Sequence, residues 1–552
     1  MSHESVTKFI LSVLNRTQEL YMNNSHSIVF DAVEVPINPA AGNYLIQFYV
    51  LLSVIWLLCN ISIPKVPLQF IKSLSEMLFL NVTVLLLMPV ILTFNCTVSL
   101  IRYGIRISFK YFYHGEFILM NSSDAFWAIE DKNQSCNFNC VYVLQGVCDV
   151  AKIRQKIWAI TEKKDYERMR RIVVHKFGFF CWRRVSNMNI RNHVKILENP
   201  NKNATTEKQV FAHIQKLDVV FPQNKPPWEA LIIPNFMYED QEEGKRHYAL
   251  IFRVHHAIMD GISAGQIIRN EIADGSTTLS VNPCDKVRIS KLQRFGAYLI
   301  FAMTGVRATV KSLLLPERNA FHTGEALKGP KTFGWSKKID LKALKQVKDK
   351  TGTTTTAVLL SALGLGLKNL ATSKNYSFPS VIHAGPTVAV LPYPNTKPQN
   401  RFILAHLPIE VGSGQRIRVL QNVHKQARNL STSSELIMNQ ILLWLVGRWP
   451  VFVMQIFMRM LHATVLVSNV PGFKEECYLF GDRLVDAVGW PPLKVSTGIA
   501  MCLFSYAGKV RAAIVGDTVS LAEDSDVEKL VQEFEKEIEC LAADAGVTTS
   551  VF

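Results

Sequence analysis

The sequence lacks the cysteine pattern of a metal-binding or disulfide-stabilised protein. Ten cysteines are spread over 552 residues, and Cys136 and Cys140 are not followed by a second pair at the spacing of a zinc site. A long chain without dense cysteines does not depend on disulfides, which is typical of a reducing compartment. We therefore expect no metal site.

Nucleic-acid-binding motifs are missing as well, although the chain carries a formal net charge of +16. There is no zinc-finger spacing and no aromatic–glycine RNA-binding signature. A basic surface favours anionic partners in general, including anionic lipids and phosphate-bearing cosubstrates. We expect no nucleic-acid partner, and we interpret the basic clusters Lys163–Lys164 and Arg168–Arg171 as solvated helix faces.

Charged residues are absent from two long segments near the N-terminus. Residues 44–63 are uncharged, strongly apolar and long enough to span a bilayer. A second uncharged run covers residues 77–101 and contains Pro89, which membrane-spanning helices tolerate. We predict a two-helix membrane hairpin within an N-terminal region, residues 1–117. The alternative is a pair of buried core helices.

Strands and helices alternate along the rest of the chain. Tyr248–Val254 is rich in aromatic and β-branched residues and predicts a strand. Ile262–Ala273 has apolar residues at helical spacing. Similar patterns recur in both halves, which favours an α/β fold of two lobes. The predicted boundaries are a first lobe at 118–275, a crossover at 276–335 and a second lobe at 336–552.

A later apolar run, residues 436–461, is interrupted by Arg448, Pro450 and Arg459. Charged side chains are costly inside a bilayer. We therefore predict a core or membrane-surface helix here rather than a third membrane-spanning helix.

The segment from His255 to Gly261, His-His-Ala-Ile-Met-Asp-Gly, follows the predicted strand and precedes the predicted helix. Histidine can act as a general base near neutral pH, and we expect Gly261 to permit a sharp turn or a positive φ. The alternative is a surface histidine pair before an ordinary Asp–Gly turn. Four fixed letters at this spacing arise by chance in well under ~1% of such chains. We predict a catalytic turn in which His256 is the base.

This segment resembles the HHxxxDG motif of the wax ester synthase/diacylglycerol acyltransferase family, within the condensation-domain and chloramphenicol-acetyltransferase-like superfamily. The resemblance extends over roughly residues 118–545 and leaves the apolar N-terminus outside. The other segments that resemble the family are Asp124–Trp127, Pro227–Glu229, Asp340–Leu370, the Ser-Asn-Val-Pro-Gly signature within Val467–Gly472, and Ser505–Gly508.

The resemblance implies an O-acyltransferase that moves a fatty acyl group from acyl-CoA to a lipid hydroxyl. The acceptor would be a long-chain alcohol, giving a wax ester, or diacylglycerol, giving triacylglycerol. His256 would take the hydroxyl proton, His255 would support it, and Asp260 would hold the loop. Ser468 or Asn469 could donate to the oxyanion, and a structural turn is equally compatible. Acyl-CoA is then a cosubstrate, and no tightly bound cofactor is implied.

The resemblance and the predicted anchor together suggest where the protein works. A lipid acceptor favours a membrane enzyme, and a thioester donor favours a cytosolic catalytic body. We therefore expect the membrane of the endoplasmic reticulum or the surface of a lipid droplet.

Two positions depart from the family pattern. Thr356-Ala357 stands where the family often has Asn-Asp, and Gln399 replaces the glycine before Asn400. The first departure supports the alternative of a non-catalytic lipid-binding protein on the same fold, whereas the intact His256 weighs against it. The DFGWG segment of a related plant-type acyltransferase family is not found; the nearest match, Thr332–Trp335, lies in the predicted crossover.

Overall fold

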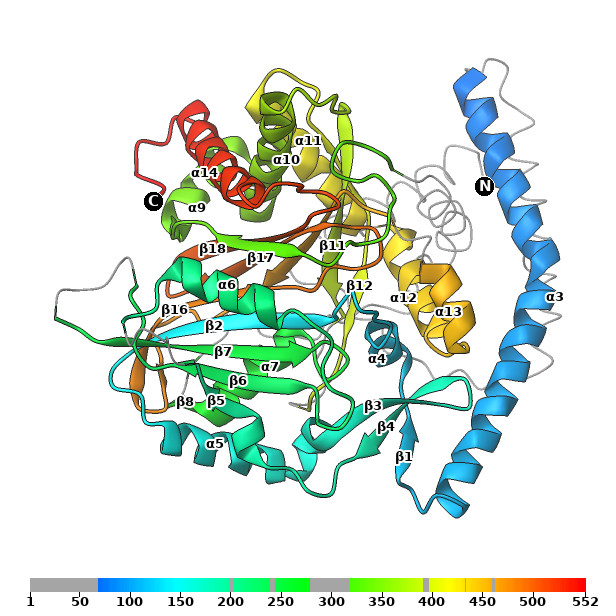
Figure 1. Ribbon diagram of the computed structural model, residues 1–552. Helices are drawn as coiled ribbons and strands as arrows, with labels where there is room; N and C mark the ends of the chain where they lie inside the picture. Colours follow the sequence, from blue (N-terminus) through cyan, green and yellow to red (C-terminus); the bar gives the residue numbers. More distant parts are fainter. Residues whose placement is uncertain are drawn as a thin grey trace, which may run out of the picture.

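Two large β-sheets form the body of the molecule, and one long helix lies against its side (Figure 1). The computed structural model describes residues 68–197, 203–238, 244–275, 277, 317–390, 397–431, 433–458 and 462–552. The sheets belong to two lobes, which confirms the predicted two-lobed α/β fold.

The first sheet has seven strands in the order β5-β6-β7-β2-β16-β15-β8. Neighbouring strands are antiparallel except for the parallel pair β5 and β6. The strand bounds are β2 Asn137–Gln145, β5 Val194–Ile196, β6 Trp228–Ile233, β7 His247–His255, β8 Ala273–Asp274, β15 Tyr478–Leu479 and β16 Asp482–Trp490.

Both faces of this sheet are covered, which explains why its central strands read as continuous apolar runs. Helix α5 (Val150–Glu162) packs on one face against Tyr142 and Leu250. Helix α6 (Glu207–Leu217) packs on the other face against Val141 and Ile251. Alternate residues of one strand therefore serve two separate hydrophobic clusters.

The second sheet runs in the order β10-β18-β17-β14-β11-β12, with β13 also paired to β11 and β9 to β18. Four helices, α9, α10, α11 and α14, supply apolar side chains to the cluster on one of its faces (Figure 1). The bounds are β9 Lys331–Trp335, β10 Ile339–Asp340, α9 Leu341–Thr351, α10 Thr355–Ser373, β11 Val381–Ala389, β12 Phe402–Leu404, β13 Leu407–Glu410, α11 Arg416–Ser431, β14 Val465–Val470, β17 Ile499–Tyr506, β18 Lys509–Asp517 and α14 Asp526–Asp544.

Some strands lie in a different lobe from their neighbours in sequence. β15 and β16 come from the C-terminal part of the chain, yet β16 pairs with β2 along the first sheet. β9, at the end of the predicted crossover, pairs with β18 in the second sheet. The two sheets are thus linked by strands as well as by side-chain packing.

Helix α3 (Leu68–Tyr111, 44 residues) is longer than the predicted run 77–101 and contains Pro89 without interruption. Its segment Leu86–Tyr111 is long and apolar enough to cross a membrane, and most of its residues are exposed. It is the one such helix in the part of the chain that the structure describes. The first half of the predicted hairpin, residues 44–63, lies outside the described residues.

The C-terminal half of α3 is attached to the first lobe. Val98, Ile105 and Phe109 pack in a small cluster with Phe117 and Cys181. These last two residues belong to a three-stranded sheet of β1 (Phe117–Leu119), β4 (Phe179–Arg184) and β3 (Arg171–Lys176). A polar contact joins the helix to a loop far along the chain, because Trp449 Nε1 donates to Asn95 Oδ1 at 3.0 Å.

The predicted helix at 436–461 is two helices, α12 (Ser434–Val446) and α13 (Val451–Met458). The chain breaks between them because Pro450 cannot continue α12. A Cβ on Gly447 would lie 2.2 Å from the carbonyl oxygen of Ser122, so α12 ends in close contact with α4 (Ser122–Trp127). Trp444 and Phe452 are more than half exposed, as a membrane-surface element requires.

Candidate active site

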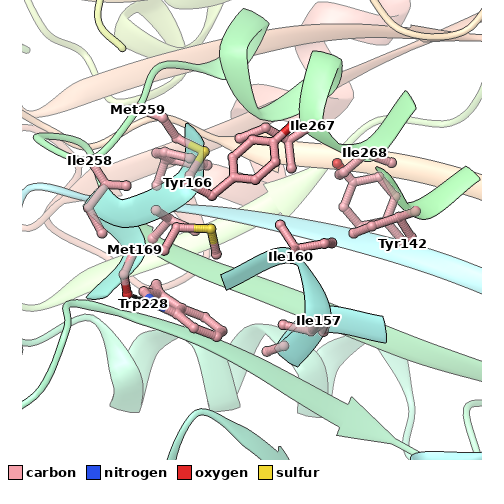
Figure 2. Packing of buried hydrophobic residues seen from close by; sticks show 14 of the residues in the cluster. Tyr142, Ile157, Ile160, Tyr166, Met169, Trp228, Ile258, Met259, Ile267 and Ile268 are labelled. Carbon is pink, nitrogen blue, oxygen red and sulfur yellow. Dashed lines mark hydrogen bonds between the residues drawn. The ribbon is translucent and has the colours of Figure 1, made fainter. Parts of the chain in front are cut away.

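The His255–Gly261 segment forms the turn between β7 and α7 (Gly261–Ile267). Its middle residues Ile258 and Met259 point into the hydrophobic cluster of the first lobe (Figure 2). The backbone N–H of His256 donates to the carbonyl oxygen of Cys136 at 2.7 Å. Buried apolar side chains thus hold the turn on one side, while a strand backbone holds it on the other.

The ring of His256 is half-buried among aromatic side chains. It stacks on Trp127 with 4.0 Å between centroids and 21° between planes. Phe138 and Phe402 approach it edge-on at 5.5 and 5.6 Å. Burial lowers the pKa of His256 to about 3, because the apolar surroundings disfavour the charged form. The imidazole is therefore neutral at physiological pH, as a proton acceptor must be.

Asn400 determines which ring nitrogen of His256 carries the proton. The Asn400 Nδ2 amide donates to Asp124 Oδ1 and to the His256 carbonyl oxygen, both at 2.9 Å. Its Oδ1 must therefore face His256 Nδ1, which lies 3.0 Å away. Since that oxygen only accepts, Nδ1 carries the hydrogen and Nε2 keeps the lone pair. We call His256, Asn400 and Asp124 the histidine network.

Arg168 completes this network from the 3₁₀ helix η1 (Lys164–Arg170). Its guanidinium contacts Asp124 Oδ2 at 2.9 Å and donates to the Ile258 carbonyl oxygen at 3.1 Å. Burial raises the pKa of Asp124, and the charge of Arg168 opposes that shift. The prediction that Arg168–Arg171 is a solvated face is wrong, because Arg168 pairs with a fully buried carboxylate and Arg171 is itself buried.

His255 points to a different set of groups. Its Nδ1 accepts the Ala257 N–H at 3.1 Å, and its Nε2 lies 3.3 Å from Glu130 Oε2. Burial acts to raise the pKa of Glu130, but His255, the Cys136 N–H and the charge of Lys494 together lower it. Lys494 lies close by, and its ammonium contacts Cys136 Sγ at 3.1 Å. His255 thus stabilises the turn beside His256.

Asp260 and Gly261 connect the turn to the second lobe. Asp260 Oδ1 caps α7 by accepting the Ser263 N–H at 2.9 Å, and its Oδ2 accepts the Arg401 N–H at 2.7 Å. Of the two conformations that we expected for Gly261, a sharp turn or a positive φ, the positive φ is not found. The space beside Gly261 is tight, because an added Cβ would lie 3.0 Å from the Val470 side chain.

The two predicted oxyanion donors lie on β14, beside Val470. Ser468 is half-buried, and its Oγ accepts from Thr387 Oγ1 at 3.5 Å, whereas Asn469 is exposed. The signature glycine has a packing role, because a Cβ on Gly472 would lie 1.7 Å from the Ser505 carbonyl oxygen. The structure thus brings this segment to the His255–Gly261 turn through Val470 and Gly261.

Ala357, at the departure from the family pattern, lies in the first turn of α10. Its N–H donates to Thr354 Oγ1 at 3.2 Å, and its side chain belongs to the hydrophobic cluster of the second lobe. Trp127 and Phe402, which surround His256, belong to the other cluster. The substitution therefore alters a helix N-terminus in the second lobe rather than the surroundings of His256.

Sequence reasoning did not find the partners of His256. Asn400, Asp124 and Trp127 stood in segments that resemble the family, yet nothing in the sequence connected them to the histidine. Asn400 lies 144 positions from His256, so only the tertiary fold brings them together. The signal that the sequence offered was the position of these residues in segments that resemble the family.

Replacing Asn400 by leucine should lower kcat by roughly 10- to 100-fold, an effect of the size seen when groups that orient a histidine are removed. The leucine keeps the volume but leaves the imidazole free to take the wrong tautomer. Steady-state acyl transfer measures the loss. Asn422→Leu is the matched control: its amide donates to Glu410 Oε2 at 2.9 Å in the second lobe, outside the histidine network, so kcat should fall much less. Equal losses in both variants would contradict the positioning role.

Comparisons with known proteins give the same assignment. The wax ester synthase/diacylglycerol acyltransferase catalytic domain matches residues 119–332, and the C-terminal domain of that family matches residues 399–542. A Mycobacterium tuberculosis protein named as a diacylglycerol O-acyltransferase is 22% identical over 377 residues, which cover 60% of this chain and 71% of that protein.

Solved structures share the fold at low identity. The Marinobacter aquaeolei wax ester synthase/diacylglycerol acyltransferase aligns with a TM-score of 0.53 at 16% identity, covering 77% of this chain and 99% of that one. The trichothecene 15-O-acetyltransferase of Fusarium sporotrichioides aligns at 0.52 and 10% identity, covering 77% and 95%. The starter condensation domain of rhizomide synthetase aligns at 0.52 and 13% identity, covering 79% and 95%.

The solved structures show that the chain has the two-lobed, condensation-domain-like α/β fold. More specifically, the chain belongs to the wax ester synthase/diacylglycerol acyltransferase family, and it is an O-acyltransferase.

Proposed function

We propose that this enzyme transfers a fatty acyl group from acyl-CoA to the hydroxyl of a membrane lipid, with His256 as general base. The observation that carries the proposal is the hydrogen bond between His256 Nδ1 and Asn400 Oδ1 at 3.0 Å. It leaves Nε2 as the proton acceptor within a mostly apolar surrounding. The HHxxxDG family resemblance and the relatives' names support acyl-CoA and a lipid hydroxyl as the substrates.

The reaction balances with one proton passed through His256. Nε2 takes the hydroxyl proton while the acceptor oxygen attacks the thioester carbonyl carbon. The tetrahedral intermediate then collapses, the carbon–sulfur bond breaks, and the coenzyme A thiolate takes the proton back from Nε2. The products are the ester and free coenzyme A. Ser468 and Asn469 remain our candidates for binding the oxyanion, and the chemistry needs no tightly bound cofactor.

The acceptor is proposed to be a long-chain alcohol or diacylglycerol, because the enzyme carries an apolar helix suited to a membrane. The segment Leu86–Tyr111 of α3 supports membrane association by its length and composition. We place the catalytic body on the cytosolic side of the endoplasmic reticulum or at a lipid droplet, where acyl-CoA is available. A non-catalytic lipid-binding role is not favoured, since Ala357 lies in the other cluster from the rings around His256.

The test is acyl transfer in membranes that contain the full chain. Labelled long-chain acyl-CoA is supplied with either hexadecanol or diacylglycerol, and membranes with His256→Ala serve as the blank. A new ester absent from the blank supports the proposal, and the acceptor that yields it distinguishes wax ester from triacylglycerol. If folded protein esterifies neither acceptor above the blank, both substrate proposals fail.

A further inference from the structure

An apolar pocket lies directly behind the aromatic rings that surround His256. It contains about 590 Å³ of space, counting the part open to solvent, and is formed mainly by β12, α12 and α13. Phe402 is shared between the two sites, because it lines the pocket and its ring approaches His256 at 5.6 Å. Phe126 also lines the pocket and neighbours Trp127, on which His256 stacks.

The wall of this pocket offers little to a polar ligand. Two of its lining residues are polar, and both are engaged by protein groups. The Asn439 amide donates to the Leu404 carbonyl oxygen at 2.7 Å. His406 Nε2 lies 3.0 Å from the His462 carbonyl oxygen, and its Nδ1 lies 3.7 Å from Glu435. The remaining lining residues are aromatic or aliphatic, so the pocket suits a hydrocarbon chain.

The helices that cover the pocket carry apolar side chains on their outer surface as well. Ile441 and Trp444 of α12 and Phe452 and Ile456 of α13 are exposed, the last two by more than 60%. Exposed apolar groups of this size, gathered on two adjacent helices, mark a membrane or partner surface.

The position of α3 identifies the bilayer as the partner. Figure 1 shows α12 and α13 between the body and α3, and Trp449 in the loop joining α12 to α13 contacts Asn95 and Phe94 of that helix. Arg448 in the same loop donates to Ser99 at 3.4 Å. Helix α3 itself exposes Leu86, Val90 and Leu100, in the same part of the helix that contacts this loop.

We propose that the pocket under α12 and α13 binds the hydrocarbon chain of a lipid substrate, which enters from the bilayer held against these helices by α3. The inference rests on the proposed function, because it assigns a substrate site to that reaction. It adds a membrane route formed in part by α3, which precedes the residues matched by the family. The bound hydrocarbon chain is that of either the acyl group or the acceptor, because both substrates carry the same kind of apolar chain.

The first test fills the pocket with Leu443→Trp. For the substrate whose hydrocarbon chain occupies the pocket, kcat/KM with a long chain divided by kcat/KM with a short chain should fall at least about tenfold. Each methylene that the tryptophan excludes from the pocket would have contributed roughly fourfold to binding. Acyl-CoA length is varied with a fixed acceptor, and acceptor length with a fixed acyl-CoA. The series that loses its length preference identifies the source. Val219→Trp, at an exposed loop position, is the matched control and should change neither ratio.

The second test does not require catalysis, so its failure is separable from failure of the proposed function. His256→Ala protein in phosphatidylcholine vesicles is irradiated with a long-chain alcohol, or with a fatty acyl-CoA, that carries a terminal diazirine. Labelling within residues 402–406 or 439–458, which line the pocket, supports the site, and labelling confined to other peptides overturns it. This mapping also decides the question if Leu443→Trp does not fold. Unchanged length preference in a folded Leu443→Trp protein would equally overturn the proposal.

Entry from the membrane is tested with Phe452→Ser and Ile456→Ser combined. Transfer with substrate embedded in vesicles should fall severalfold relative to transfer with short substrates dissolved in water. An equal loss of transfer with vesicle-embedded and with water-dissolved substrates would overturn the membrane route. The pocket assignment would then depend on the labelling experiment alone.

Discussion

Replacing His256 by glutamine should lower kcat by about 10²- to 10⁴-fold, the usual contribution of a positioned general base. Glutamine fills much of the space beside Trp127, and its amide cannot take a proton from the acceptor hydroxyl. The free energy of unfolding should change far less than the rate, because the aromatic packing is largely kept. Single-turnover acyl transfer with a saturating lipid acceptor measures the chemical step.

The control for this substitution is His193→Gln. His193 is also buried and stacks on an indole, with 4.5 Å between its ring and that of Trp228, but it contacts no member of the histidine network among the described residues. We expect a loss of stability there with kcat nearly retained. A comparable loss of kcat in both variants would mean that histidine packing, and not proton transfer, explains the effect.

The pH dependence provides a further check on His256. Its lowered pKa, about 3, keeps the free base available down to strongly acidic pH, whereas an ordinary histidine would be half protonated near pH 6.5. Protonation of His256 should therefore cause no decline in kcat/KM between pH 8 and pH 5. Any decline seen in that range should remain in the His256→Gln variant. A decline in kcat/KM centred near pH 6.5 in the unmodified enzyme, and absent from the variant, would contradict the lowered pKa of His256.

Arg168→Met should destabilise the protein by about 3–5 kcal/mol, the usual effect of leaving one partner of a buried ion pair without the other. Asp124 is fully buried, and Arg168 is its charged partner at 2.9 Å. Burial already raises the pKa of Asp124, and losing the arginine raises it further. The folded variant then binds a proton at pH values where the unfolded chain does not, so its stability falls as pH rises through that range. Urea unfolding at pH 5 and pH 8 measures the difference.

The double variant Asp124→Asn with Arg168→Met is the decisive comparison. An asparagine at position 124 removes the unpaired charge and can still accept from Asn400. The double variant should therefore recover at least half of the stability lost by Arg168→Met, and its stability should depend less on pH. Strictly additive losses would show that the arginine acts through its contacts with Ile258 and Trp182 rather than through the carboxylate.

The local elements of the site were predictable because their patterns lie within a few residues. The strand at Tyr248–Val254 is β7, and the helix predicted from Ile262 begins one residue earlier, at Gly261. Such elements follow from periodicity and from the capping aspartate. The network around His256 was not predictable in this way, because its partners come from α4 and from the loop before β12.

Two predicted elements were single where the structure has pairs, and packing against other segments contributes to each break. The segment Phe402–Ile409 looks like one strand in the sequence, but the structure divides it into β12 and β13, which pair with different parts of β11. The predicted helix at 436–461 is divided near Gly447, where α12 meets the Ser122 backbone. The local sequence shows the secondary-structure propensity of these segments. It does not show the segments from elsewhere in the chain that pack where each element is interrupted.

The position of β16 has a consequence for synthesis of the protein. β2 gains β16 as its second neighbour only after residue 490 has left the ribosome, roughly 20–70 s after β2 itself at typical elongation rates. Until then one edge of a central strand is open, and open edges invite pairing with other chains. A fragment ending before β16 would keep that edge permanently, so the N-terminal lobe is not a unit that can be produced alone. Nascent chains of this enzyme need protection during that interval.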